Sequence, residues 1–310
     1  MTGPRALIVH GGAGDWGTGR EAAALSGVRA AARAGGEVLA DGGSALDAVV
    51  AATRVLEENP LFNAGIGSTL NLDGDVETDA AVMCGATLRS GGVAALRGFR
   101  APIAVARAVL EQTDHVLIAG EGASRFATMI DAERFDLHTD ARRVRWRERL
   151  DALQSGGDDW LPRMRALIAA HPELNRGTVG AVAIDASGHT AATSSTGGVA
   201  LKLAGRIGDS PVPGAGLYAT TSAAVTATGR GELALRTLPC LRACDRIAAG
   251  AGAQDALEVT VEALRAQVGA DVGLIGVDAT GSVAVAHGTP DLPWASWSPG
   301  GERSSMRAPR

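Results

Sequence analysis

Gly177-Thr-Val-Gly-Ala-Val-Ala-Ile-Asp185 is an apolar run that follows a charged segment of the chain. A short apolar run bounded by turn residues is typical of a buried strand. The hydroxyl of Thr178 is a good nucleophile only when a base lies beside it, and one such base is the threonine's own α-amine. That amine exists only if the chain is cut before Thr178. Because Thr also favours strands and Gly ends loops, this step alone leaves an ordinary strand start open.

Outward from this run, short strands and helices follow each other along the chain. Ser44 is expected to cap a helix over residues 45–58, and Pro60 to end it. Further helices are expected at 21–39, 102–112, 122–130, 231–249 and 253–268, and strands at 5–9, 68–72, 78–83, 179–185, 190–195, 273–277 and 283–287. Residues 298–310 are expected to fray. Strands in antiparallel-type pairs and helices in groups predict an α+β protein whose sheets are covered by helices.

Residues 131–177 differ from the rest of the chain because they are charged and only weakly periodic. We interpret them as a linker or mobile arm, with a helix over Trp160–Ala170. The basic part, Asp140-Ala-Arg-Arg-Val-Arg-Trp-Arg-Glu-Arg149, is interpreted as a solvated helix or tail rather than as a nucleic-acid surface.

The composition argues against several classes of protein. The 310 residues carry a net charge of −5, are 46% apolar and only 3% aromatic, which argues against a nucleic-acid surface. No apolar run approaches the roughly 18 residues that span a bilayer. Cys84, Cys240 and Cys244 are too few and too unevenly spaced for a disulfide framework or a zinc site. With no secretory signal at its start, we expect a cytoplasmic protein with no nucleic-acid or membrane partner.

Three polar stretches follow the apolar run. Thr193-Ser-Ser-Thr-Gly-Gly198 brings hydroxyls and glycines to a strand end. In the Gly- and Pro-bearing loop that comes next, Arg206 suits a carboxylate and Asp209 suits an ammonium, as the head group of an α-amino acid requires; a surface Arg–Asp pair is the alternative. Thr226-Ala-Thr-Gly-Arg-Gly-Glu232 opens a helix whose first N–H groups suit an oxyanion.

The order of these motifs resembles the plant-type L-asparaginases and isoaspartyl peptidases, which are N-terminal-nucleophile (Ntn) hydrolases. The resemblance covers roughly residues 5 to 290. It rests on six motifs: His10-Gly-Gly-Ala-Gly14, Asn59-Pro-Leu-Phe-Asn-Ala-Gly-Ile-Gly67, Gly177-Thr-Val-Gly-Ala-Val182, Ser195-Thr-Gly-Gly198, Gly205-Arg-Ile-Gly-Asp-Ser-Pro211 and Thr228-Gly-Arg-Gly-Glu232.

The resemblance implies a four-layer αββα sandwich made as a precursor that cuts itself between Gly177 and Thr178. One domain would then consist of an α subunit, residues 1–177 with 131–177 as a mobile tail, and a β subunit, residues 178–310. The new N-terminal threonine would hydrolyse the side-chain amide of L-asparagine and the isopeptide bond of β-aspartyl dipeptides. Family members of this type are expected to form homodimers of such cut protomers.

The resemblance also implies roles for individual residues. Thr178 would be the nucleophile, Thr196 would tune it, and Thr228 with the Gly229 N–H would face the oxyanion. Arg206, Asp209 and Gly229 would bind the substrate, with Asn63 close to Thr178 and His10 as a supporting residue. No organic cofactor is expected. A structural Na⁺ or K⁺ would be held by the backbone carbonyls of Leu56, Glu57, Asn59, Phe62, Ala64 and Ile66.

Three positions depart from the family pattern: Leu201 before Lys202, Arg230 between two glycines, and the Ala286–Thr289 stretch. Two related alternatives stay open, a glycosylasparaginase-like amidase and a non-catalytic amino-acid-binding relative of the same fold. The preference between asparagine and β-aspartyl peptides also stays open. Gly12-Ala-Gly-Asp-Trp-Gly17 matches a dinucleotide fingerprint, but the chain lacks the regular βαβ alternation of that fold.

Overall fold

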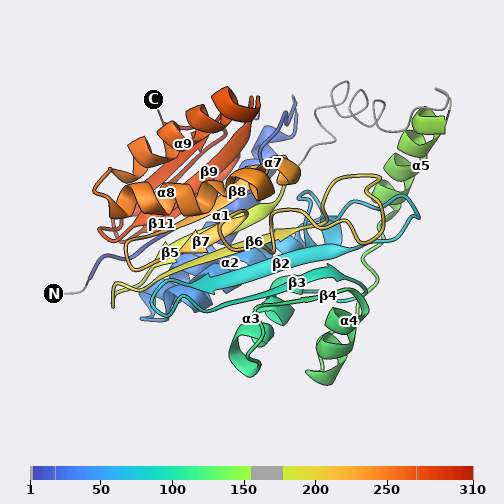
Figure 1. The fold of residues 1–310 in the computed structure, drawn as a ribbon, viewed down its shortest axis with the longest axis horizontal. Coiled ribbons are helices and arrows are strands. Elements are labelled where there is room, and N and C mark those ends of the chain that lie inside the picture. Colours follow the sequence, from blue (N-terminus) through green and yellow to red (C-terminus); the bar gives the residue numbers. More distant parts are fainter. Residues whose placement is uncertain (1–2, 18, 155–176, 270, 310) are drawn as a thin grey trace.

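Two β-sheets form the centre of the protein in a computed structural model that describes residues 3–17, 19–154, 177–269 and 271–309 (Figure 1). The eight-stranded sheet has the order β12-β11-β1-β5-β6-β2-β3-β4, and the four-stranded sheet has the order β10-β9-β8-β7. Only β3 and β4 pair in parallel among these strands. The strands are β1 Ala6–His10, β2 Thr78–Cys84, β3 Ser90–Leu96, β4 Leu117–Ala119, β5 Val179–Ile184, β6 Thr190–Thr196, β7 Leu217–Ala219, β8 Ala223–Gly229, β9 Val272–Asp278, β10 Val283–His287, β11 Trp294–Ser298 and β12 Gly301–Ser305.

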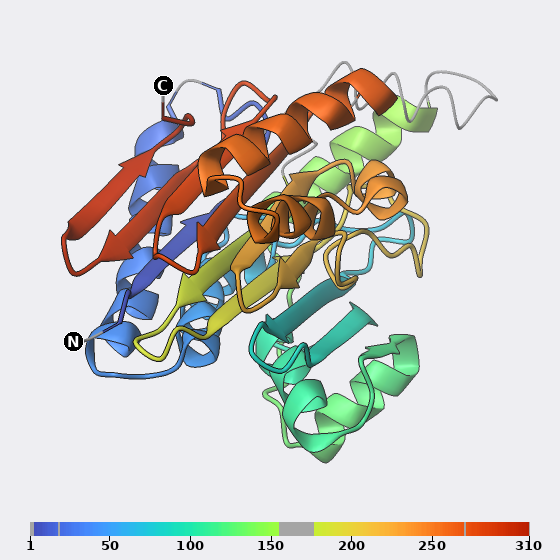
Figure 2. The ribbon, with the colours of Figure 1, turned by 60° about the vertical axis from the view of Figure 1, so that its left-hand side comes forward.

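Helices lie on opposite sides of these strands, with the blue α1 and α2 on one side and the orange α8 and α9 on the other (Figures 1 and 2). The described helices are α1 Glu21–Ala40, α2 Ala45–Glu58, α3 Pro102–Gln112, α4 Gly120–Met129, α5 Asp140–Gln154, α7 Gly231–Thr237, α8 Pro239–Ala248 and α9 Ala253–Val268, with a short 3₁₀ turn, η1, over Gly65–Gly67. The expected ranges of α2, α3 and α9 are confirmed. As expected, the Ser44 hydroxyl accepts a hydrogen bond from the Asp47 N–H at the start of α2.

The two faces of the eight-stranded sheet bury different groups of side chains. One face packs against α1, α2 and α3 in a large apolar cluster. Helix α1 approaches the sheet closely because Gly35 and Gly36 leave room for Leu7 and for the Trp297 ring. The other face contributes residues such as Ile8 and Val182, which pack against Ile275 and other residues of the four-stranded sheet. Burial of apolar surface on both faces is the main stabilising contribution to such an arrangement.

The four-stranded sheet uses its second face to bind α8 and α9. Val225 and Leu274 of the sheet pack there against Cys244 and Leu257 of the helices. The strands β5 and β8 are buried. Thr178 directly precedes β5, and Thr228 lies near the end of β8.

Three expectations about secondary structure are wrong. Residues 68–72 are not a strand, because the Asn71 side chain accepts the N–H groups of residues 73 and 75 and forms a turn. The expected helix over 231–249 is broken at Leu238, which is left-handed (φ 49°) and precedes Pro239. The stretch 298–310 contains strand β12, which pairs with β11, and Glu302 forms an ion pair with Arg33.

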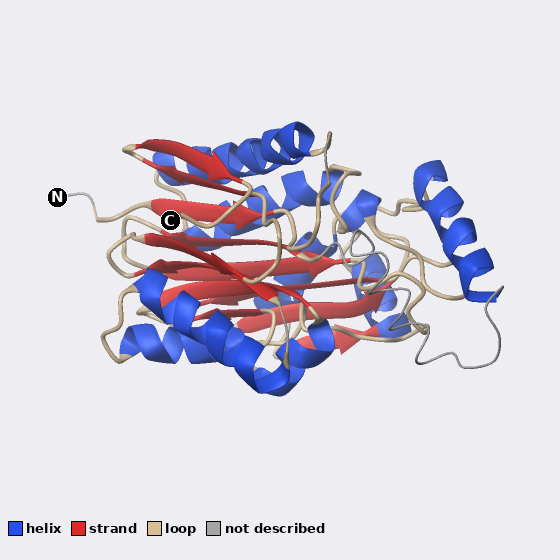
Figure 3. Ribbon diagram, turned by 90° about the horizontal axis from the view of Figure 1, so that it is seen from above, coloured by secondary structure: helices blue, strands red, loops and turns tan. Residues whose placement is uncertain are grey.

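Part of the 131–177 stretch is more ordered than a linker. Helix α5 occupies Asp140–Gln154 and lies at one end of the molecule, beyond the strand ends (Figures 1 and 3). It is attached by Trp146, whose indole N–H donates to the Asn71 carbonyl at 2.9 Å, and by the buried Arg142. The helix expected over residues 160–170 lies outside the described residues. No helix of the described part is both long and apolar enough to cross a membrane.

Candidate active site

Thr178 lies directly before β5, which runs between β1 and β6 in the eight-stranded sheet. Its side chain is buried, and its Oγ1 lies 3.0 Å from the Oγ of Ser210, which is completely buried. A buried hydroxyl pair at this distance is a hydrogen bond that orients both groups. Sequence reasoning did not single out Ser210. The available signal was its place beside Asp209 in the same Gly-Pro loop.

The Gly177 backbone is enclosed by two other parts of the expected site. A Cβ atom at residue 177 would collide with Thr228 Oγ1, and a Cβ atom on Gly12 would lie 2.6 Å from the Gly177 carbonyl oxygen. Thr228 Oγ1 in turn accepts a hydrogen bond from the Ala13 N–H at 3.1 Å. The Gly177–Thr178 bond therefore lies between the glycine-rich end of β1 and the end of β8.

Gly229 ends strand β8 next to Thr228. Its φ of +145° and the nearby Asp271 carbonyl oxygen, 3.1 Å from where a Cβ would lie, favour glycine at this position. The chain then enters α7 at Gly231, and the Gly229 N–H belongs to the residue directly after Thr228. An N–H beside a hydroxyl is a suitable donor pair for a developing oxyanion.

Thr196 and Asn63 lie on the other side of Thr178. Val179 pairs with Ser195 in the sheet, so the preceding Thr178 and the following Thr196 lie at adjacent strand ends. Thr196 Oγ1 accepts a hydrogen bond from the Gly198 N–H at 3.0 Å. Asn63 connects its loop to the same turn, since its Nδ2 donates to the Gly198 carbonyl at 2.7 Å.

Arg206 and Asp209 come together without pairing with each other. The Arg206 guanidinium donates to Glu232, while a Cβ atom on Gly231 would lie 2.8 Å from Asp209 Oδ1 and 2.9 Å from Arg206 Nη2. Asp209 Oδ2 has no hydrogen-bond partner among the described residues. Burial raises the pKa of the Asp209 carboxyl to about 6, although the Arg206 charge lowers it. A buried carboxylate oxygen without a partner is suited to an incoming ammonium.

His10 lies at the end of β1, against the start of β5. Its ring is fully buried, and a Cβ atom on Gly180 would lie 2.7 Å from its Nε2. Burial lowers the pKa of His10 to about 3, with the Thr178 backbone acting in the opposite direction. The imidazole is therefore neutral at physiological pH.

Leu201, one of the departures from the family pattern, has a left-handed backbone with φ 57°. Asn tolerates this conformation more readily than Leu does. Leu201 is nevertheless buried, and its neighbour Lys202 donates from Nζ to the Glu77 carbonyl at 3.1 Å. Burial lowers the pKa of Lys202, and the nearby Asp79 charge raises it.

The loop between α2 and residue 67 turns its carbonyl groups toward glycines. A Cβ atom on Gly65 would collide with the Glu57 carbonyl, and one on Gly67 would collide with the Phe62 carbonyl. Glycine at both positions lets the chain pass close to the carbonyls of Glu57 and Phe62, two of the groups expected to hold a monovalent cation. The buried Arg142 of α5 also donates to this loop, with Nη2 lying 3.3 Å from Phe62 O and 3.5 Å from Pro60 O. None of the ion pairs among the described residues includes Arg142.

We expect Arg142→Met to lower the free energy of unfolding by about 1–3 kcal/mol, because buried carbonyls lose a charged hydrogen-bond donor. Thermal unfolding in NaCl should also become more sensitive to salt concentration, since the guanidinium no longer repels a cation from the loop. The matched control is the exposed Arg143→Met on the same helix. Equal melting temperatures and equal salt responses in the two variants would contradict this role.

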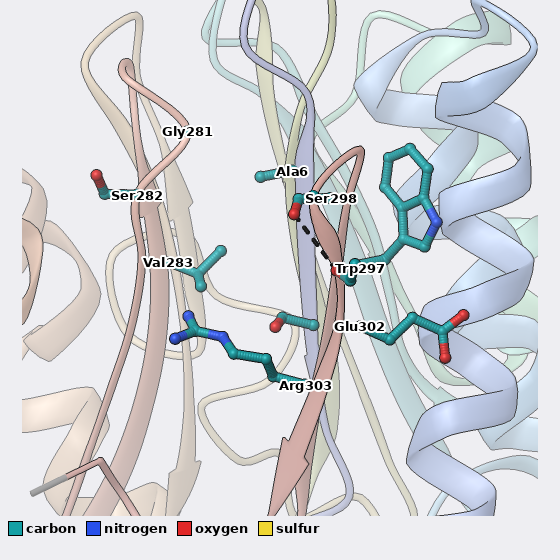
Figure 4. A pocket seen from close by; sticks show the side chains of 11 residues that line it. Ala6, Gly281, Ser282, Val283, Trp297, Ser298, Glu302 and Arg303 are labelled. Atoms are coloured by element: carbon teal, nitrogen blue, oxygen red, sulfur yellow. Dashed lines mark hydrogen bonds between the residues drawn. The ribbon is translucent and has the colours of Figure 1, made fainter.

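One cavity of about 400 Å³ lies away from Thr178, between strand β10 and the β11–β12 hairpin (Figure 4). Figure 4 shows Arg303 extending toward Val283 across it, with Ser298 above. None of the expected site residues lines this cavity.

Comparison with known proteins gives a consistent result. The sequence profile of the asparaginase family matches residues 3–304. The chain belongs to the asparaginase family. A plant-type L-asparaginase from Pyrococcus abyssi is 46% identical over 94% of this chain and 95% of that protein. An isoaspartyl peptidase from Escherichia coli (strain K12) is 39% identical over 97% of this chain and 94% of that protein. An isoaspartyl peptidase/L-asparaginase from Danio rerio is 37% identical over 94% of this chain and 91% of that protein.

This asparaginase-family chain brings residues from distant motifs into one region. The polar groups come from the ends of β5, β6 and β8 and from the loop that carries Arg206 and Asp209. Ser210 joins them through its hydrogen bond to Thr178.

Proposed function

We propose that this protein is an autocleaving amidohydrolase that acts on L-asparagine and β-aspartyl dipeptides and releases L-aspartate. The observation that carries the proposal is the enclosure of the Gly177–Thr178 bond, with the Thr178 hydroxyl bonded to Ser210 and the Gly177 backbone against Thr228. The names of the relatives, L-asparaginase and isoaspartyl peptidase, support the choice of substrates.

Maturation begins with attack of the Thr178 hydroxyl on the Gly177 carbonyl carbon. A C–O ester bond forms, the C–N peptide bond breaks, and the nitrogen leaves as the Thr178 α-amine. Water then hydrolyses the ester, which restores the hydroxyl and leaves a carboxylate on Gly177. Ser210 positions the attacking oxygen. The Thr228 hydroxyl, which lies against the α-carbon of Gly177, is the proposed donor to the carbonyl oxygen as it becomes negative.

In the mature enzyme, the α-amine of Thr178 is the base. Its pKa of roughly 7.7–8.0 is close to working pH, so it can accept the hydroxyl proton. The hydroxyl then attacks the side-chain amide carbon, the amine leaving group takes the proton, and an acyl-enzyme ester forms. Water hydrolyses this ester to aspartate. Thr228 and the Gly229 N–H stabilise the oxyanion, and Thr196 adjusts the reactivity of the Thr178 hydroxyl.

The substrate head group is held at the start of α7. Arg206 binds the α-carboxylate through its planar guanidinium, and Asp209 accepts from the α-ammonium. Asparagine and β-aspartyl peptides share this head group and the β-amide, which explains why both are substrates. The unpartnered Asp209 Oδ2 and the position of both side chains next to Gly231 support this assignment.

We further propose that the two sheets and their helices form a four-layer αββα sandwich, built after cleavage from an α subunit (1–177) and a β subunit (178–310). The three apolar clusters, one on each side of the sheets and one between them, support the layering. A homodimer of cut protomers and a Na⁺ or K⁺ on the carbonyls of residues 56–66 complete the proposal. When bound, the cation would hold this loop, and with it Asn63, in place.

Intact mass spectrometry of the purified protein tests the cleavage. We expect fragments of 177 and 133 residues, about 18 and 13 kDa of the total 31.3 kDa, with the smaller one starting at Thr178. Aspartate release from asparagine and from β-aspartyl-leucine should appear together with the fragments. An active chain that stays at 31.3 kDa would overturn the proposal.

Further assays distinguish two related functions from the proposed one. A glycosylasparaginase-like amidase would hydrolyse glycosylated asparagine faster than either proposed substrate. A non-catalytic relative would bind aspartate while remaining a single chain without turnover.

A further inference from the structure

Arg230 lies between two subsites of the proposed active site. Gly229, on one side, is the proposed oxyanion donor, and Gly231, on the other, is next to Arg206 and Asp209. Arg230 has an extended backbone (φ −79°, ψ 102°) and directly precedes α7. The Arg230 side chain therefore leaves the backbone between the proposed oxyanion donor and the proposed site for the substrate head group.

The last side chains of β8 lie along the proposed active site up to the residue before Gly229. Side chains two residues apart on a strand point to the same face. Thr226 Oγ1 lies 2.6 Å from where a Cβ on Gly180 would be, and Thr228 Oγ1 lies against Gly177. Strand β8 ends at Gly229, so the exposed Arg230 is the first residue beyond this strand, two positions after Thr228.

No acidic side chain in the described part of the protein forms an ion pair with Arg230. Two nearby acids bind other arginines: Glu232 pairs with Arg206, and Asp271, opposite the end of β8, pairs with Arg265 at 3.7 Å. Arg230 itself is exposed and forms no ion pair with a described residue. A guanidinium in this situation is available to a carboxylate of a ligand.

We propose that Arg230 recognises the α-carboxylate of the leaving amino acid and makes β-aspartyl peptides better substrates than asparagine. This inference rests on the proposed function. The two substrates differ only beyond the scissile bond: asparagine releases ammonia, whereas a β-aspartyl dipeptide releases an amino acid. In that amino acid, the carboxylate is attached to the carbon next to the scissile nitrogen, within reach of a side chain as long as arginine.

The test compares three substrates with one head group: β-aspartyl-leucine, β-aspartyl-leucinamide, which lacks the terminal carboxylate, and asparagine. We expect the wild-type kcat/KM to be about ten-fold higher for the acid than for the amide, as a charged contact to a ligand implies. In Arg230→Met, this acid-to-amide ratio should fall to about one, and Arg230→Lys should keep part of it. Added salt should lower the wild-type ratio, because screening weakens an exposed contact.

Arg236→Met is the matched control, since Arg236 is an exposed arginine of helix α7, which follows Arg230. Intact mass spectrometry of every variant shows whether cleavage has occurred, so that ratios are compared between matured enzymes only. A wild-type ratio near one, or a ratio that Arg230→Met leaves unchanged, overturns the role of Arg230 while the proposed function stands. Failure of the matured wild type to hydrolyse any of the three substrates overturns both.

Discussion

Thr178→Ala is expected to remain a single chain of 310 residues and to lose amide hydrolysis by at least about 10³-fold, because one hydroxyl performs both reactions. The change removes Oγ1, the atom that in the proposed mechanism attacks first the Gly177 carbonyl and later the substrate. Intact mass spectrometry and aspartate release measure the two losses separately. Alanine can occupy the buried position of Thr178, so the variant should fold, and its thermal unfolding should remain cooperative.

Thr178→Ser is the matched control because it keeps the hydroxyl and loses only a methyl group. It should still be cut before residue 178 and should retain measurable turnover. A Thr178→Ala protein that hydrolyses asparagine while uncut would refute the nucleophile assignment. If Thr178→Ser lost as much activity as Thr178→Ala, the methyl group as well as the hydroxyl would be needed to orient the nucleophile.

Asp209→Asn is expected to lower kcat/KM for asparagine by at least about 100-fold and to raise thermal stability at pH 8. The loss of activity follows from removal of the negative charge that is proposed to accept the substrate ammonium. Breaking a buried charged pair costs several kcal/mol. The gain in stability follows from the pKa, which burial raises from 3.8 to about 6. An ionised, buried carboxylate without a partner for Oδ2 destabilises the folded state, and the amide carries no such charge.

The pH dependence distinguishes this cause from a general packing effect. Asp209 ionises in the unfolded chain near pH 3.8 and in the folded protein near pH 6, so its stabilising protonated form is lost as pH rises through this window. The difference in melting temperature between Asp209→Asn and wild type should therefore be small at pH 4 and largest above pH 6. Wild-type kcat/KM should fall more steeply below about pH 6, where Asp209 takes up a proton in addition to the α-amine of Thr178. The exposed Asp245→Asn should keep the melting temperature and the pH profile of kcat/KM of the wild type. A pH-independent difference between Asp209→Asn and wild type would exclude this explanation.

Much of the secondary structure was predictable because local signals agreed with the fold. Helices α2, α3 and α9 have a cap, an initial proline or a terminal glycine at the expected positions. Strands β5 and β10 are short apolar runs between turns. In these elements, apolar periodicity and end signals point to the same boundaries.

Strands β3 and β8 were missed for a physical reason. Their sequences, Ser-Gly-Gly-Val-Ala-Ala-Leu and Ala-Ala-Val-Thr-Ala-Thr-Gly, are rich in Ala and Gly, which are depleted in strands. Both strands are buried in sheets, where pairing on either side replaces the missing local preference. The omission of β8 mattered most, because this strand positions Thr228.

The residue types of the site were determined by the sequence itself. A Gly–Thr step before an apolar strand, an Arg and an Asp in one loop, and a Thr–Gly turn before a helix are chemical features that depend on residues close together in the chain. These local features, together with their order, were sufficient to identify the family.

Only the tertiary structure decided which of these groups meet. Ser210 reaches Thr178 across 32 positions of sequence, and Thr228 Oγ1 accepts from Ala13 across 215. Arg206 binds Glu232 rather than Asp209, and Arg142 reaches a loop 80 residues away. Such contacts depend on how two sheets pack face to face, which is decided by burial of many side chains together and leaves no local pattern at the residues that finally touch.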